Sequence, residues 1–75
     1  MARTQSVEIL AEMVANVLTV AVSPGDEVAA GDAVILLESM KMEIPVLAEQ
    51  GGTVTAVKVT SGDVVQEGDV LIVLG

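Results

Sequence analysis

The chain has 75 residues, with eleven acidic and three basic side chains and a net charge of −8. A chain this short forms one small domain that buries little more than ~60% of its unfolded surface, which excludes a second domain. The negative charge excludes nucleic acids and anionic membranes as partners and favours a monomer. We recognise no targeting or membrane-spanning segment and expect a cytoplasmic protein.

The composition predicts an all-β fold with no catalytic activity of its own. Cysteine, histidine and aromatic residues are absent, and fifteen valines supply much of the apolar content. Neither a disulfide nor a histidine-bound metal can brace the domain, so its core must come from aliphatic side chains, and β-branched ones favour strands. Without histidine or cysteine, the usual general bases and nucleophiles are also missing.

Taken in chain order, the sequence alternates strand-like runs with glycine turns. Residues 1–5 are polar and aperiodic, so we expect them to be flexible and the domain to cover residues 6–75. Short extended pieces are expected around Val28 and at Val64-Val65. Longer strands are predicted at 6–12, 15–22, 33–38, 43–48, 52–59 and 70–74.

Two parts of the chain repeat one pattern. An offset of 37 superimposes residues 17–37 on 54–74 with ten identities and no gap, which indicates an internal duplication. In both copies the alternation of apolar side chains breaks at one place, after Val17 and after Val54, which predicts a β-bulge there. Two related halves, interlocked about a pseudo-twofold axis as a flattened barrel or sandwich, are the simplest assembly.

Each copy carries two Gly-Asp pairs, at 25–26 and 31–32 and again at 62–63 and 68–69. Four aspartates suggest an oxygen-rich cation site, but their spacing matches no calcium-binding loop. Glycine reaches positive φ freely, and an aspartate carboxylate can accept bonds from nearby backbone amides. We therefore predict four turns and no metal site.

Residues 33–38 and 43–48 are predicted to form the arms of a hairpin whose tip is Ser39-Met40-Lys41-Met42. Tight hairpins favour Asn-Gly or Asp-Gly, because their central residues often take positive φ. Lys41 and two methionines at this bend suggest a lysine presented to an enzyme. The alternative is a solvated lysine whose methionines fold onto the core, and the residues alone leave both readings open.

Residues 38–43, Glu-Ser-Met-Lys-Met-Glu, lie between two Gly-Asp-x-Val-x-x-Gly-Asp segments, and Lys41 lies about 34 residues before the C-terminus. This arrangement resembles the biotinyl/lipoyl-attachment domain family over about residues 7–75, and specifically its biotin carboxyl carrier branch. Lipoyl-bearing members usually read Asp-Lys-Ala at this place, so Met-Lys-Met is similar to the biotin type. The resemblance implies a flattened barrel of two four-stranded antiparallel sheets, with the modified lysine on an exposed hairpin.

The resemblance further implies a carrier protein rather than an enzyme. Biotin on Lys41 would take a carboxyl group from a biotin carboxylase to a carboxyltransferase, after attachment by a biotin protein ligase. Met40 and Met42 are expected to belong with Lys41 to the cofactor-binding site, and Glu38, Ser39 and Glu43 are expected to aid ligase recognition. A lipoyl carrier and an unmodified interaction module of the same fold remain as alternatives.

Three departures from the family pattern stand out. Serine replaces the usual alanine before Met40, which should leave ligase recognition intact. The usual Ala-Pro-Met-x-Gly reads Ala-Glu-Met-Val-Ala at residues 11–15 and loses both proline and glycine, which puts the local backbone in question. No insertion precedes the strand at 33–38, so the protruding thumb of some carriers is expected to be absent, as in small free-standing biotinylated proteins and multi-carboxylase subunits.

Overall fold

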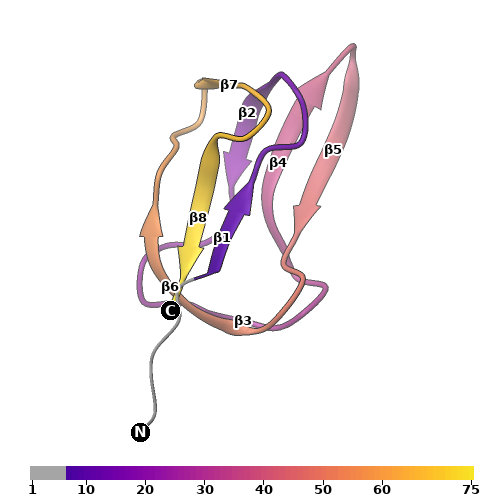
Figure 1. Cartoon of the computed structure of the whole chain (residues 1–75). Helices are drawn as coiled ribbons and strands as arrows, with labels where there is room; N and C mark the ends of the chain where they lie inside the picture. The colour runs from indigo at the N-terminus through magenta and orange to yellow at the C-terminus, as the bar shows by residue number, and fades with distance from the viewer. Residues whose placement is uncertain (1–6) are drawn as a thin grey trace, which may run out of the picture.

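The computed structural model describes residues 7–75, so the expectations for residues 1–5 and for Ser6 lie outside it. Eight strands and no helix form in the described range, and none of these residues could therefore cross a membrane as a helix. Figure 1 shows their arrangement. The strands are β1 (Val7–Leu10), β2 (Ala15–Val20), β3 (Glu27–Val28), β4 (Ala33–Ser39), β5 (Met42–Leu47), β6 (Gly52–Val57), β7 (Val64–Val65) and β8 (Val70–Leu74).

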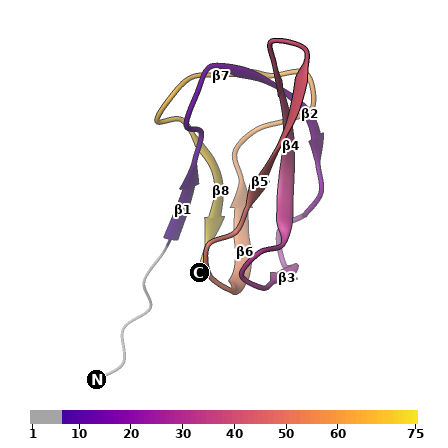
Figure 2. The same cartoon turned by 90° about the vertical axis from the view of Figure 1, so that its right-hand side faces the viewer.

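The strands form two four-stranded sheets, in the orders β1-β8-β6-β3 and β5-β4-β2-β7, and every pairing is antiparallel. In Figure 2, β1 and β8 lie on the left and β2 and β4 on the right. The all-β prediction with two four-stranded sheets is confirmed. The first strand was predicted too long, since it ends at Leu10.

Both predicted bulges are present. In the β2–β4 pair Val17 lies opposite Leu37 and Thr19 opposite Leu36, so Leu18 is the extra residue. The β6–β8 pair shows the same shift between Val54 and Ala56. A bulge adds one residue to one strand and increases its twist, which explains why the apolar alternation changes face at the same point in both copies.

Hydrogen bonds between the copies confirm that the halves interlock. The Val17 N–H donates to the Asp63 carbonyl at 2.8 Å, and the Val54 N–H donates to the Asp26 carbonyl at 2.8 Å. The glycine before each aspartate donates back to the same two valines, at 2.7 and 2.8 Å. The backbone groups of each turn are therefore hydrogen-bonded to a strand of the other half, as a pseudo-twofold axis requires.

The four Gly-Asp turns form as predicted. All four glycines have positive φ, between 92° and 98°. Each aspartate Oδ2 accepts a bond from the backbone N–H three residues earlier, as Asp26 does from Ser23 at 2.9 Å and Asp63 does from Thr60 at 2.8 Å. These carboxylates close turns, and within residues 7–75 no group of three or more metal-ligating side chains comes together.

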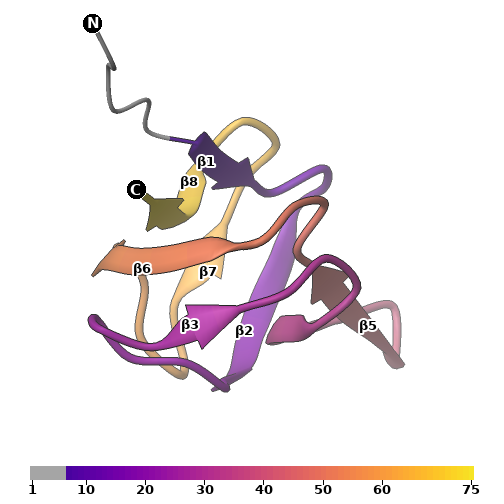
Figure 3. The ribbon, with the colours of Figure 1, turned by 90° about the horizontal axis from the view of Figure 1, so that it is seen from below.

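The core is entirely aliphatic, with no buried polar side chain among the described residues. Its most enclosed members occupy equivalent positions in the two copies, as with Ile35 and Ile72, which are 1% and 0% exposed. Figure 1 shows the β4–β5 hairpin rising at one end and the C-terminus lying at the other. Figure 3 is viewed from the latter end and shows β3 beside β6, its hydrogen-bonded neighbour. The tip of the β4–β5 hairpin therefore lies at the end of the molecule opposite the C-terminus (Figure 1).

Candidate functional site

The tip of the β4–β5 hairpin is a two-residue turn. Ser39 and Met42 are the last paired residues, and Met40 and Lys41 form the bend with φ of 53° and 65°. Positive φ at both central residues is the signature of a type I′ turn, whose twist matches that of the flanking strands. Residues with a side chain disfavour this conformation. The tip thus keeps a lysine where the backbone would favour Asn-Gly.

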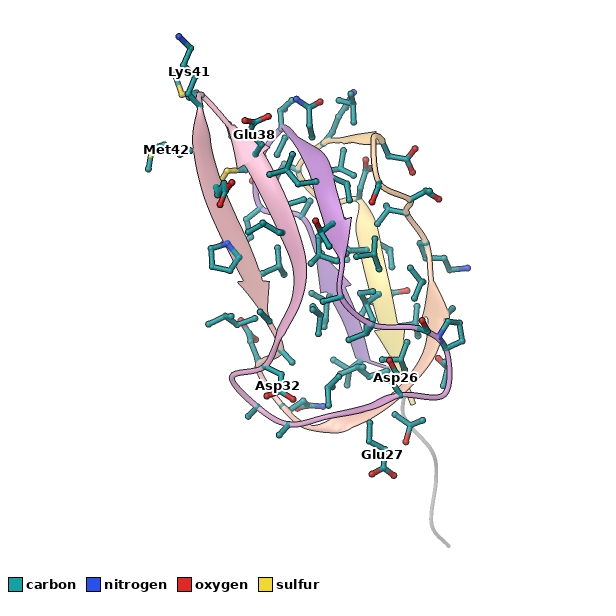
Figure 4. All side chains as sticks on the ribbon, turned by 180° about the vertical axis from the view of Figure 1, so that it is seen from behind. Asp26, Glu27, Asp32, Glu38, Lys41 and Met42 are labelled. Carbon is teal, nitrogen blue, oxygen red and sulfur yellow. The ribbon has the colours of Figure 1, made fainter. Side chains whose placement is uncertain are left out.

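The side chains at the tip face solvent. Met40 is 90% exposed and Met42 is 63% exposed. Lys41 extends beyond the end of both strands, with Met42 beside it on β5 (Figure 4). The alternative in which the methionines fold onto the core is therefore wrong. Among the described residues only Lys58 offers a second side-chain amine, and it lies just beyond β6, away from any hairpin tip.

Two carboxylates stand at the base of the tip. Glu38 and Glu43 are directly opposite each other in the β4–β5 register, one step below Ser39 and Met42. Like charges at such positions repel and destabilise the pair. Ser39, which lies between Glu38 and the turn, is partly buried. Of the residues predicted for the site, all six therefore gather within residues 38–43 on one hairpin.

Four further residues approach the tip from parts of the chain distant in sequence. A shallow groove of about 290 Å³ runs beside the hairpin, and Lys41 itself forms part of its wall. The rest of the lining comprises Val14, Ala15, Asn16, Glu38, Ser39, Met40 and Val64. Sequence reasoning missed Val14, Ala15, Asn16 and Val64. The duplication held one signal, because Val64 aligns with the acidic Glu27 of the first copy.

Residues 11–15, which depart from the usual family pattern, have an ordinary backbone conformation. Ala11 and Ala15 are 2% and 5% exposed, and Met13 is 37% exposed. None of these residues has positive φ. The backbone at residue 15 therefore does not require the glycine that the family pattern usually carries, and Ala15 is buried there.

Comparison with known proteins identifies the domain. The family model described as "Biotin-requiring enzyme" matches residues 7–74, nearly the whole chain. The chain belongs to this biotinyl/lipoyl-attachment family. The recognition made from residues 38–43 and the flanking Gly-Asp segments is confirmed, and so, at the level of the family, is covalent biotin as the cofactor.

The biotinyl domain has named relatives among curated proteins. It is 60% identical over 38 residues to "Biotinylated protein TB7.3" of Mycobacterium tuberculosis and to its homologue in Mycobacterium leprae, and these alignments cover 51% of this chain and 54% of each relative. It is 50% identical over 38 residues to "Glutaconyl-CoA decarboxylase subunit gamma" of Acidaminococcus fermentans, of which the alignment covers 26%. The chain thus spans about half the length of the mycobacterial relatives it matches.

Solved structures of carboxylases contain the same fold. The urea carboxylase of Kluyveromyces lactis matches with a TM-score of 0.89 and 31% identity, over 100% of this chain and 7% of that one. A single-chain, multi-domain long-chain acyl-CoA carboxylase matches with a TM-score of 0.87 and 30% identity, over 97% and 7%. In both cases the biotinyl domain corresponds to a small part of a much larger enzyme.

Proposed function

We propose that Lys41 carries biotin in amide linkage on its Nζ and that the domain serves as a carboxyl carrier. The observation that carries the proposal is the exposed, left-handed Met40-Lys41 turn in a domain of the biotin-requiring family. The turn holds Lys41 clear of the sheets, where another protein can reach its amine from several sides. Lys58 follows a strand and has no such presentation.

The attachment chemistry falls to a biotin protein ligase. The ligase activates the biotin carboxyl group as an adenylate, and the deprotonated Lys41 Nζ attacks its carbonyl carbon. A C–N bond forms, the bond from carbon to the phosphate oxygen breaks, and AMP leaves. The proton from the amine passes to a base of the ligase, since the described residues near Lys41 include no histidine or cysteine. The carrier's own contribution is to present the amine.

Met40 and Met42 are proposed to form the apolar part of the surface that the ligase reads, because flexible, polarisable thioethers adapt to a partner surface. Glu38 and Glu43 are proposed to steer a basic ligase surface toward the tip. Their opposed positions cost stability in the free domain, and a cationic partner relieves that repulsion. Ser39, which pairs with Met42 at the last step before the turn, is proposed to complete the surface that the ligase reads.

The proposed partners are a biotin carboxylase and a carboxyltransferase. Attached biotin supplies a site that accepts a carboxyl group at one active centre and releases it at another. The tether replaces free diffusion by a high effective concentration at each centre. The relatives support this role, since they include a decarboxylase subunit and domains of two carboxylases.

The test is the intact mass of the protein after incubation with a biotin protein ligase, ATP and biotin. Wild type and Lys58→Arg should each gain one biotin less one water, and Lys41→Arg should gain nothing while keeping its circular dichroism spectrum. Labelling of Lys41→Arg would move the site to Lys58 and refute the proposal. A parallel reaction with a lipoate ligase and lipoate should leave the wild-type mass unchanged; lipoylation without biotinylation would favour the lipoyl carrier.

A further inference from the structure

Three exposed apolar side chains line the groove beside Lys41, although more of its surface is polar than apolar. Val14 and Val64 are 62% and 65% exposed, and Met40 is 90% exposed. Val64 pairs with Asn16 across the β2–β7 ladder, which sets it beside the start of β2. Clustered exposed apolar side chains mark binding surfaces more often than isolated ones do.

The pseudo-twofold axis supplies an internal comparison. At the offset of 37, Asn16 and Val64 correspond to Thr53 and Glu27, which pair in the same way across β3 and β6. Val14 corresponds to Gly51. Figure 4 shows Lys41 and Glu27 at opposite ends of the molecule. The same backbone thus carries a glycine and a carboxylate at the end without the lysine, and two exposed valines at the end with it.

We propose that biotin on Lys41 folds back into this groove, with its sulfur-containing ring and alkyl chain against Val14 and Val64 and its fused ureido ring near Asn16. This inference rests on the proposed attachment at Lys41. The lysine lines the groove, so a group on its Nζ is held beside it at high local concentration. Biotin in amide linkage is uncharged, so the net charge of −8 does not oppose its docking.

Asn16 gives the groove a polar element that matches the ureido group. An asparagine amide has donors and an acceptor side by side, and a ureido group presents N–H donors beside a carbonyl acceptor. Glu38 is the cross-strand partner of Asn16 and offers a second acceptor for N–H groups. Thr53, at the corresponding position of the other end, has only a hydroxyl. The tether on Lys41 and the Asn16 amide together favour docking at the end that carries the lysine.

Because the groove is shallow, the biotinylated Lys41 side chain occupies it only part of the time. The attached biotin therefore exchanges between a docked and an extended state. A protein that binds extended biotin then associates more slowly, in proportion to the extended fraction. A substitution that weakens docking in the groove should accelerate that association by about two- to fivefold. The domain would in this way shield its biotin between partners without preventing transfer.

The first experiment compares backbone amide NMR shifts of the domain before and after biotinylation, with attachment verified by intact mass. Docking predicts shifts at Val14, Asn16 and Val64 as well as at the turn, and none at Gly51, Thr53 and Glu27. Changes confined to residues 39–43 in the biotinylated protein would overturn the inference and leave the proposed function standing. Absence of any attached biotin would overturn both.

The second experiment measures the association rate of biotinylated variants with streptavidin. Val64→Glu takes the residue that the other copy uses at this register, and Val64→Thr keeps the side-chain shape without adding charge. Both should associate about two- to fivefold faster than wild type, whereas Glu27→Val, the matched control at the opposite end, should associate at the wild-type rate. Equal rates for all four proteins would overturn the inference. Slower attachment of biotin to Val64→Glu, with equal streptavidin rates, would show a ligase-docking surface in its place.

Discussion

Replacement of the tip by the residues that its backbone favours should stabilise the domain while removing its function. The variant is Met40→Asn/Lys41→Gly, which provides the Asn-Gly pair typical of type I′ turns. Both native residues have positive φ, and that conformation costs an L-residue roughly 1–2 kcal/mol. Met40 is 90% exposed, so its replacement sacrifices little packing.

The expected gain follows from two opposing effects. Glycine at position 41 removes the steric cost but loses about 0.5–1 kcal/mol more backbone entropy on folding. Asparagine at position 40 tolerates the left-handed region better than methionine does. The free energy of unfolding should therefore rise by about 1–2 kcal/mol, which for a domain of this size raises Tm by about 4–16 °C.

Thermal and urea unfolding followed by far-UV circular dichroism would measure this gain, since the chain has no aromatic residue to report by fluorescence. Met42→Gly is the matched control, because Met42 is exposed at the same tip but has no positive φ. Glycine there should lower stability by about 0.5–1 kcal/mol. A double variant that is no more stable than wild type would refute the view that the lysine is retained at a conformational cost.

Three further predictions concern the turns, the core and the methionine after Lys41. Asp26→Ala and Asp63→Ala each remove one equivalent turn bond and should lower the free energy of unfolding by the same amount, about 1 kcal/mol; urea titrations that differ by more than twofold would contradict the symmetry. Ile35→Ala and Ile72→Ala should each cost about 2–5 kcal/mol in the same titrations, and a cost below 1 kcal/mol would contradict their enclosure. Met42→Leu should accept biotin normally but transfer carboxyl groups more slowly, measured as label reaching the acceptor; equal rates would exclude a role for the thioether.

The fold could be predicted from the sequence where one signal appeared twice. The Gly-Asp turns and the break in alternation after Val17 recur after Val54, so chance is a poor explanation for either. The hairpin at residues 33–48 is a local structure, and its tip follows from the two arms. Local patterns and their repetition therefore gave the strands, the bulges and the position of Lys41.

The groove beside the tip could not be predicted in this way. Asn16 and Val64 meet only because β7 of the second copy pairs with β2 of the first, and no local pattern reports that contact. In the sequence Val14 and Val64 look like ordinary apolar residues, and the alignment of Val64 with Glu27 does not say that either valine lies near Lys41. Only the paired strands show that they surround the lysine, and only the comparison with Glu27 shows that their apolar character is confined to this end.

A tryptic mass map of the biotinylated protein tests the central claim most directly. Arg3, Lys41 and Lys58 are the only basic residues, and trypsin does not cleave after a lysine whose amine is acylated. Biotin on Lys41 predicts one modified peptide spanning residues 4–58, together with an unmodified peptide 59–75. A modified peptide spanning residues 42–75, with free peptide 4–41, would place biotin on Lys58 and contradict the account.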